Sequence, residues 1–228
     1  MTPSAIVTDI EGTTSSIAFV HEVLFPYSRA RLADYVPAHR DAVAPILEAV
    51  RAEAGDPALD EAGCISLLLE WHDADRKIAP LKDLQGMIWA EGFAAGAFTG
   101  HIYPDAVAGL RRWHARSIPL YIYSSGSVGA QKLLFGHSDY GDLLPLFAGH
   151  FDTAVGGKKE AASYRAIAGS LGSPAGEILF LSDVEAELAA AREAGMQVTL
   201  LARDGLPETS DFPVTDSFDT ILAEAPAQ

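Results

Sequence analysis

The chain has 228 residues, 49% of them hydrophobic, which is enough for one large domain or for a domain with an insert. Acidic residues outnumber basic residues by 31 to 16, and the formal net charge of −15 disfavours nucleic acid and anionic membrane surfaces as partners. The same charge repels phosphorylated molecules. A phosphate site in this chain therefore needs a metal ion and a few cations placed close to it.

Targeting signals and cysteine content indicate the compartment. No apolar run approaches the roughly 18 residues of a membrane helix, and Met1 to Ser4 lack the basic region of a signal peptide. The one cysteine, Cys64, permits no intrachain disulfide, and its apolar helical surroundings favour a core residue over a nucleophile. We expect a cytoplasmic protein without membrane association.

The first strand and its turn hold the earliest functional signal. An apolar run closing at residues 6–7 predicts a buried strand, Asp9 follows it, and Gly12 permits a tight turn. Ligands of open α/β sheets bind outside the carboxyl ends of the strands, where Asp9 is expected to lie. Asp9 and Glu11 could act as nucleophile or metal ligand and as acid/base, and the threonines at 13–14 suit a bound anion. The alternative is an acidic glycine turn without function.

The region from there to about Gly100 is predicted to be helical, because its apolar residues recur at three- and four-residue steps. The expected landmarks are a break at Pro26, two shorter helices divided by Pro37 and Pro45, a loop at 55–57 and a helix starting at Pro80. Nothing in this region alternates like a strand. The pattern predicts an all-helical insert between two parts of an α/β domain.

Strands and helices alternate in the remainder of the chain. The expected helices are 105–116, 128–135, 161–171 and a segment ending near 194, and the expected strands are 120–123, 151–155, 178–181 and 198–201. The tail after Arg203 contains three prolines and is expected at the surface. This alternation predicts an α/β fold with a doubly wound, mostly parallel, Rossmann-like sheet.

Residues that could take part in catalysis or ligand binding follow four of the predicted strands: Asp9, Ser124, Lys158 and Asp183. Taken singly, the serine and the second aspartate could cap helices and the lysine could be a solvated charge. Together they supply a carboxylate nucleophile, a hydroxyl for phosphate oxygens, a cation and a metal-binding carboxylate. Phosphoryl transfer through an aspartyl-phosphate needs this set.

The order Asp-x-Glu-Gly-Thr, a strand ending in Ser, a Lys and Asp-Val-x-x-Glu resembles the four motifs of the haloacid dehalogenase (HAD) superfamily. Within it, the chain resembles the enolase-phosphatase family of methionine salvage over nearly its whole length. The glutamate of the first motif, Glu11, is more specific than the aspartate usual in the superfamily. The segments that carry the closer resemblance are 9–14, 19–27, 71–77, 84–89, 121–127 and 131–136.

The resemblance implies a role for each motif residue. Asp9 would attack phosphorus, and Glu11 would protonate the leaving oxygen and then activate the hydrolytic water. Mg²⁺ would be held by Asp9, Asp183, the main-chain carbonyl of Glu11 and waters. The phosphate would be bound by Ser124, Ser125 and Lys158, with Lys158 also pairing with Asp9. Glu187, one helical turn after Asp183, would contact the metal ligands or reach the metal through water.

The resemblance also implies the substrate and the domain roles. The substrate would be 5-(methylthio)-2,3-dioxopentyl 1-phosphate, enolised and then dephosphorylated to the acireductone 1,2-dihydroxy-5-(methylthio)pent-1-en-3-one. Separately from the resemblance, we expect a monomer. Residues 1–14 and 101–228 would form the core domain, and 15–100 a cap that closes over the site. The enolisation base is not identified, and Glu11 and residues 75–77 are the candidates.

Three other functions fit parts of the same sequence. A phosphatase or mutase of the same superfamily could act on another small phosphorylated metabolite, although the cap segments argue against it. A receiver-like signalling module also has acidic residues and a lysine at strand ends, but such modules are shorter and lack a helical insert. A dehalogenase is disfavoured because a halide leaving group needs no acid such as Glu11.

Overall fold

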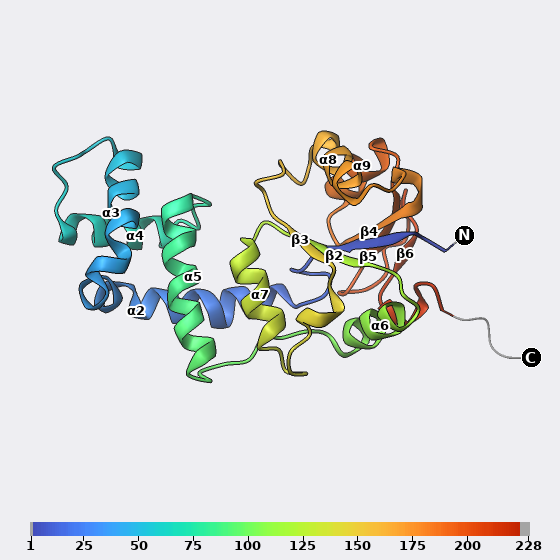
Figure 1. The fold of residues 1–228 in the computed structure, drawn as a ribbon, viewed down its shortest axis with the longest axis horizontal. Helices are drawn as coiled ribbons and strands as arrows, with labels where there is room; N and C mark the ends of the chain where they lie inside the picture. Colours follow the sequence, from blue (N-terminus) through green and yellow to red (C-terminus); the bar gives the residue numbers. More distant parts are fainter. Residues whose placement is uncertain (1, 224–228) are drawn as a thin grey trace, which may run out of the picture. The chain divides into compact units, whose positions relative to one another are not determined.

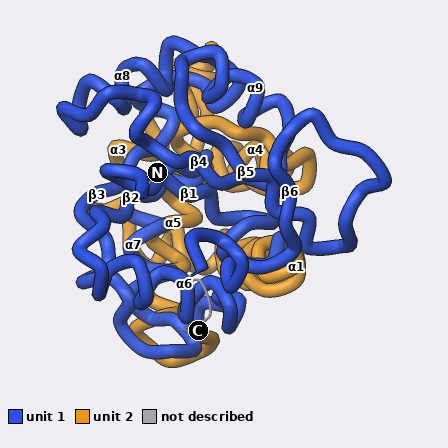
Figure 2. The backbone as a smooth tube through the Cα atoms, turned by 90° about the vertical axis from the view of Figure 1, so that its right-hand side faces the viewer, with its two compact units in different colours: residues 1–17, 100–228 blue, residues 18–99 orange. Residues whose placement is uncertain are grey.

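The computed structural model describes residues 2–223 and divides the chain into two compact units. Unit 1 comprises Met1–Ile17 and Gly100–Gln228, and unit 2 comprises Ala18–Thr99 (Figure 2). The sequence-based boundaries, after residues 14 and 100, differ from these by three residues and one residue. Each unit has its own hydrophobic core.

Unit 1 contains a six-stranded sheet in which every neighbouring pair is parallel. The strands, in chain order, are β1 (Ala5–Thr8), β2 (Leu120–Tyr123), β3 (Gly149–Phe151), β4 (Ile178–Ser182), β5 (Gln197–Leu201) and β6 (Val214–Thr215). Their order across the sheet is β3-β2-β1-β4-β5-β6. All residues of β1 and β4 are buried, as expected for central parallel strands covered on both faces.

Helices cover both faces of this sheet. The α-helices of unit 1 are α6 (Pro104–Ala115), α7 (Val128–Gly136), α8 (Ala161–Leu171) and α9 (Glu185–Glu193), with short 3-10 helices at Leu144–Leu146, Ala175–Glu177 and Phe218–Thr220. In Figure 1, α8 and α9 lie on one side of the sheet and α6 on the other. The predicted doubly wound, parallel α/β fold is confirmed.

The strand order places a topological switch point between β1 and β4. From β1 the chain continues to β2 and β3 on one side, and then crosses back to β4, β5 and β6 on the other. Ligands of doubly wound sheets bind in the crevice at such a point, outside the carboxyl ends of the strands. Asp9 follows β1 and Asp183 follows β4.

Unit 2 is helical throughout its regular structure. The helices of this region are α1 (Ile17–Phe19), a π-helical turn (Val20–Leu24), α2 (Phe25–Ala38), α3 (Arg40–Ala54), α4 (Glu61–Asp73) and α5 (Ala79–Ala94). Leu32, Val36, Val43 and Leu68 are fully buried in its core. Within residues 2–223, no helix is long and apolar enough to span a bilayer.

Two of the predicted proline effects were wrong. Pro26 does not end the helical path: it lies in the first turn of α2, directly after the π-helical turn that ends at Leu24. Pro45 lies inside α3. The expected pair of shorter helices is nevertheless confirmed as α2 and α3, with Pro37 in the last turn of α2 and the break at His39, whose φ of −124° and ψ of 36° are not helical. The other landmarks, the loop at 55–57 and the helix beginning near Pro80, are confirmed.

Two predictions in unit 1 need correction. The third strand covers 149–151 rather than 151–155, because the Asp152 carboxylate accepts the N–H groups of Val128 and Ala154 and turns the chain. The tail beyond Arg203 is not confined to the surface. It adds β6 to the sheet and buries Phe218 completely.

Candidate active site

The turn after β1 presents Asp9 at the carboxyl edge of the sheet. Asp9 is almost fully buried, its N–H donates to Leu181 O at 2.9 Å, and its Oδ1 accepts the N–H of Ile10 at 2.7 Å. Gly12 then adopts a φ of +74°, and a Cβ at this position would overlap the Asp183 carboxylate. The turn therefore needs glycine both for its conformation and for its close approach to Asp183.

Lys158 contacts two carboxylates inside the protein. Its Nζ lies 2.6 Å from Asp9 Oδ1 and 2.7 Å from Glu187 Oε2, and only 6% of its side chain is exposed. The Tyr164 hydroxyl donates to Lys158 O at 2.6 Å, which holds the backbone of this loop. The Tyr123 ring lies 5.8 Å from the ammonium. The structure thus gives Lys158 a fixed place beside Asp9.

Ser124 and Glu11 lie together at the ends of adjacent strands. The Ser124 hydroxyl donates to Glu11 Oε2 at 3.2 Å and accepts the N–H of Gly126 at 3.0 Å. Ser124 is fully buried, whereas Ser125 is exposed. The hydroxyl of Ser124 therefore lies beside the Glu11 carboxylate.

Asp183 is bound to the turn after β1 through Thr13. The Asp183 N–H donates to Thr13 Oγ1 at 3.0 Å, and the Thr13 hydroxyl donates to Asp183 Oδ1 at 3.1 Å. Glu187, four residues later, accepts the Ser182 hydroxyl at 3.0 Å in addition to its ion pair with Lys158. These contacts link five of the residues predicted from the sequence to one another or to this turn: Asp9, Glu11, Ser124, Lys158 and Asp183.

The charges of this cluster do not balance. Burial and then the Asp9 carboxylate raise the pKa of Glu11 and that of Asp183. The same two causes raise the pKa of Glu187 to about 7. Burial opposes the charge of Lys158, but Asp9 and Glu187 outweigh it and raise the pKa of Lys158. Four carboxylates around one ammonium leave an excess of negative charge that a cation would relieve.

The donor set suits Mg²⁺, which prefers oxygen ligands and keeps several waters. Asp9 and Asp183 offer carboxylates at the switch point, and the turn between Asp9 and Thr13 offers main-chain carbonyls at its edge. Across residues 2–223, no group of three or more His, Cys, Asp or Glu side chains is arranged to hold a metal ion. A site built from two carboxylates, a carbonyl and waters does not require such a group.

Arg203 contacts the turn after β1 and was not among the residues predicted from the sequence. Arg203 Nε and Nη2 donate to Thr13 O at 3.1 and 2.8 Å, and its Nη1 donates to Asp105 Oδ2 at 2.7 Å. Arg203 is the second residue after β5. The rule that singled out the other strand ends, a polar residue just past the carboxyl end, would have found it as well.

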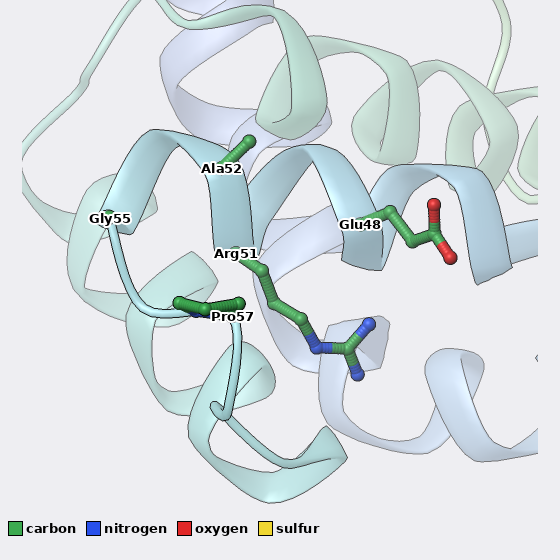
Figure 3. Close-up of a pocket in the computed structure, with 5 residues that line it drawn as sticks. All are labelled: Glu48, Arg51, Ala52, Gly55 and Pro57. Carbon is green, nitrogen blue, oxygen red and sulfur yellow. The ribbon is translucent and has the colours of Figure 1, made fainter.

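A surface hollow in unit 2 lies apart from these residues in the chain. It is lined by Glu48, Arg51, Ala52, Gly55 and Pro57, along α3 and the loop that follows (Figure 3). The Arg51 Nε is already engaged with Leu59 O at 2.8 Å. The hollow contains none of the carboxylate, lysine or serine residues described above.

Comparison with known proteins identifies the family. Residues 3–195 match the family model described as haloacid dehalogenase-like hydrolase. "Enolase-phosphatase E1" of Methylococcus capsulatus is 56% identical over 222 residues, which cover 96% of this chain and 98% of that protein. The protein of the same name from Pseudomonas aeruginosa is 55% identical, with 98% and 100% covered. The chain belongs to the enolase-phosphatase E1 family of haloacid dehalogenase-like hydrolases.

Solved structures share the fold of this chain along nearly its whole length. The crystal structure of the UTR4 protein of Saccharomyces cerevisiae superimposes with a TM-score of 0.82 at 33% identity, covering 96% of this chain and all of that one. A dehalogenase captured with an intermediate shares the fold at a TM-score of 0.57 and 18% identity. The enolase-phosphatase E1 relatives, which cover 96–98% of this chain, match the sequence of both the α/β unit and the helical unit.

Proposed function

We propose that the chain converts 5-(methylthio)-2,3-dioxopentyl 1-phosphate to the acireductone 1,2-dihydroxy-5-(methylthio)pent-1-en-3-one in methionine salvage, by enolisation followed by Mg²⁺-dependent dephosphorylation. The name of its relatives and their identity of 55–56% over nearly the full chain support the reaction. The observation that best supports the chemistry is the buried contact of Lys158 Nζ with Asp9 Oδ1 at 2.6 Å. It places a cation beside a carboxylate at the switch point of the sheet.

In the phosphatase step, Asp9 is the nucleophile. Its carboxylate oxygen forms a bond to phosphorus while the bond from phosphorus to the C1 oxygen breaks, giving an aspartyl-phosphate and an enolate-type leaving oxygen. Glu11 gives its proton to that oxygen. Glu11 then removes a proton from a water that attacks phosphorus, which releases phosphate and restores Asp9. The contact between Glu11 and Ser124 supports a position for Glu11 near the phosphate.

Three side chains bind the phosphate in this proposal. Lys158 neutralises its charge, and Ser124 and Ser125 donate hydroxyl hydrogen bonds to its oxygens. The burial of Lys158 strengthens its electrostatic effect, because little water screens it. Lys158 is thus a local cation of the kind that a chain with a net charge of −15 requires for an anionic substrate.

Mg²⁺ is assigned to Asp9, Asp183 and the main-chain carbonyl of Glu11. When bound, the ion lowers the repulsion between the Asp9 carboxylate and the phosphate and polarises the substrate oxygens. Gly12 and Thr13 support this assignment, since both bring the turn close to the Asp183 carboxylate.

The helical unit is proposed as a cap that excludes water and recognises the methylthio tail. The enolisation base is a candidate role for Glu11 or for the loop at 75–77. In that loop, Lys77 Nζ pairs with Asp75 Oδ1 at 3.0 Å, and all three side chains are exposed. A cytoplasmic location and a monomeric state are further proposals, the first supported by the single cysteine.

The test is incubation of the purified chain with the diketo phosphate and Mg²⁺, with enol and acireductone absorbance followed alongside free phosphate. We expect an enol signal before phosphate release, and turnover well above that of sugar phosphates. Phosphate release from sugar phosphates at equal or higher rates, without an enol signal, would assign the chain to another phosphatase activity. Size-exclusion chromatography with light scattering checks the monomer.

A further inference from the structure

The guanidinium of Arg203 is fixed by hydrogen bonds at all of its nitrogens. Nε and Nη2 both donate to Thr13 O, at 3.1 and 2.8 Å. Nη1 donates to Asp105 Oδ2 at 2.7 Å and to Asp216 O at 3.0 Å, and the side chain is only 11% exposed. Charge-assisted bonds of this geometry define the orientation of both partners.

Two aromatic rings pack against this guanidinium, and further hydrogen bonds fix the residues around it. Its central carbon lies 4.3 Å from the centroid of Tyr103 and 5.2 Å from that of Phe218. The Asp105 carboxylate also accepts the Phe218 N–H at 2.8 Å, and the Tyr103 N–H donates to Thr14 O at 2.9 Å. Arg203 and the residues that contact it form an anchor, which joins the start of α6, the segment after β6 and the turn after β1.

Thr13 lies between this anchor and Asp183. Its carbonyl accepts the two bonds from Arg203, while its hydroxyl exchanges hydrogen bonds with the N–H and Oδ1 of Asp183. We propose that Arg203 is a positioning residue that fixes the Asp183 carboxylate through Thr13. This inference rests on the proposed function, in which Asp183 binds Mg²⁺.

The expected consequence is weaker binding of the ion rather than loss of the fold. Mg²⁺ tolerates little deviation from octahedral geometry, so a carboxylate that moves more freely is a poorer ligand. Removing groups that orient metal ligands raises dissociation constants by about 10-fold to 100-fold. Lysine at 203 keeps the positive charge, but its single ammonium cannot replace the fork that contacts Thr13 and Asp105 together.

A purely structural role for Arg203 needs a matched control, because Arg203 also holds the segment after β6. Arg112 provides it. Its Nη2 donates to Phe218 O at 2.8 Å and to Ile221 O at 3.3 Å, so it holds the same segment against α6. The Arg112→Lys variant weakens that segment through bonds that do not involve Thr13.

The experiment is isothermal titration of Mg²⁺ into the full chain, with Tm recorded for every variant. Arg203→Lys should raise the Mg²⁺ dissociation constant by about tenfold or more. Its kcat should recover at saturating Mg²⁺, and its KM for the diketo phosphate should then match the wild type. Arg112→Lys, even with an equal loss of Tm, should bind Mg²⁺ within about twofold of the wild type.

A double-mutant cycle tests the route through Thr13. Thr13→Val removes the hydroxyl that contacts Asp183, so Arg203→Lys should add little further loss in that background. Thr13→Ser keeps the hydroxyl and should restore Mg²⁺ binding. Fully additive losses in the cycle would overturn the proposed route.

The remaining outcomes separate this inference from the proposed function. Equal Mg²⁺ affinities for Arg203→Lys and the wild type, or equal losses in the two arginine variants, would overturn the positioning role. Unchanged Mg²⁺ binding by Asp183→Asn would overturn both the metal assignment and this inference. If the wild type fails to turn over the diketo phosphate while Arg203→Lys still weakens Mg²⁺ binding, the substrate assignment fails and the positioning role is supported.

Discussion

The ammonium of Lys158 and the carboxylate of Glu187 form a buried ion pair, with Nζ 2.7 Å from Oε2. The same ammonium contacts Asp9, so Glu187 helps to determine where the positive charge lies relative to the nucleophile. Glu187 comes from α9 and Lys158 from the loop before α8. The pair thus joins two connections of the sheet at the proposed phosphate site.

Substituting Glu187 by glutamine tests this relationship. Glutamine keeps the shape and can still accept the Ser182 hydroxyl, but it removes one of the two charges that hold Lys158. We expect kcat/KM to fall by about tenfold or more, as for other groups that orient active-site residues. Tm should be retained, because the carboxylates around Lys158 already outnumber its single positive charge. Glu193→Gln, on the same helix in an exposed ion pair, should leave both values unchanged.

Asp9→Asn removes the proposed nucleophile. Phosphate release should fall by at least about 10³-fold, because loss of a nucleophile removes the covalent route. The circular dichroism spectrum should remain that of the wild type. Substitution of the exposed Asp204 by asparagine is the control and should be fully active. Substantial residual turnover by Asp9→Asn would remove Asp9 from this role.

Glu11→Gln separates the two chemical steps. Loss of the general acid should slow phosphate release by about 10²-fold to 10⁴-fold. Absorbance of the enol phosphate should then be followed beside free phosphate. Accumulation of the enol phosphate would show that Glu11 is not needed for enolisation, and loss of both signals would make Glu11 the candidate base.

Chelation tests the metal assignment. Treatment with EDTA should stop hydrolysis, and added Mg²⁺ should restore it. Without the ion, the Asp9 carboxylate and the anionic phosphate repel each other. Free phosphate is the measurement. Hydrolysis that continues unchanged in EDTA would contradict the metal role of Asp183.

Buried His72 predicts a loss of stability in acid. Burial lowers the pKa of His72 below its ordinary 6.5; among the smaller influences Asp73 raises this pKa and Arg29 lowers it. The Nε2 of His72 lies 3.1 Å from Ser28 Oγ. As the pH falls through 6.5, the unfolded chain binds the proton first. The stabilising contribution is therefore complete above that pH and is lost on acidification towards the folded pKa.

The measurement is Tm between about pH 7.5 and pH 5.5. Tm of the wild type should fall across this range, and His72→Gln should show a smaller fall. The exposed His114→Gln variant should follow the wild type. An identical pH dependence in all three proteins would show that His72 makes no such contribution.

Local sequence patterns determined most elements of this protein. Strands such as 120–123 and helices such as 161–171 were predicted at their observed bounds, because period, glycine and proline act within a few residues. The motif residues at strand ends were found for a similar reason. In a parallel sheet, the carboxyl ends of all strands meet at one edge, so topology alone brings Asp9, Ser124 and Asp183 near each other.

Only the tertiary structure decided how those residues are held. The bond between Arg203 and Thr13 spans 190 positions, and the contact of Lys158 with both Asp9 and Glu187 joins the turn after β1, the loop before α8 and the helix α9. Nor did the proline-rich tail reveal that it adds a sixth strand and buries Phe218. Such contacts depend on where distant backbone segments come to lie when the core packs, and no local pattern encodes that distance.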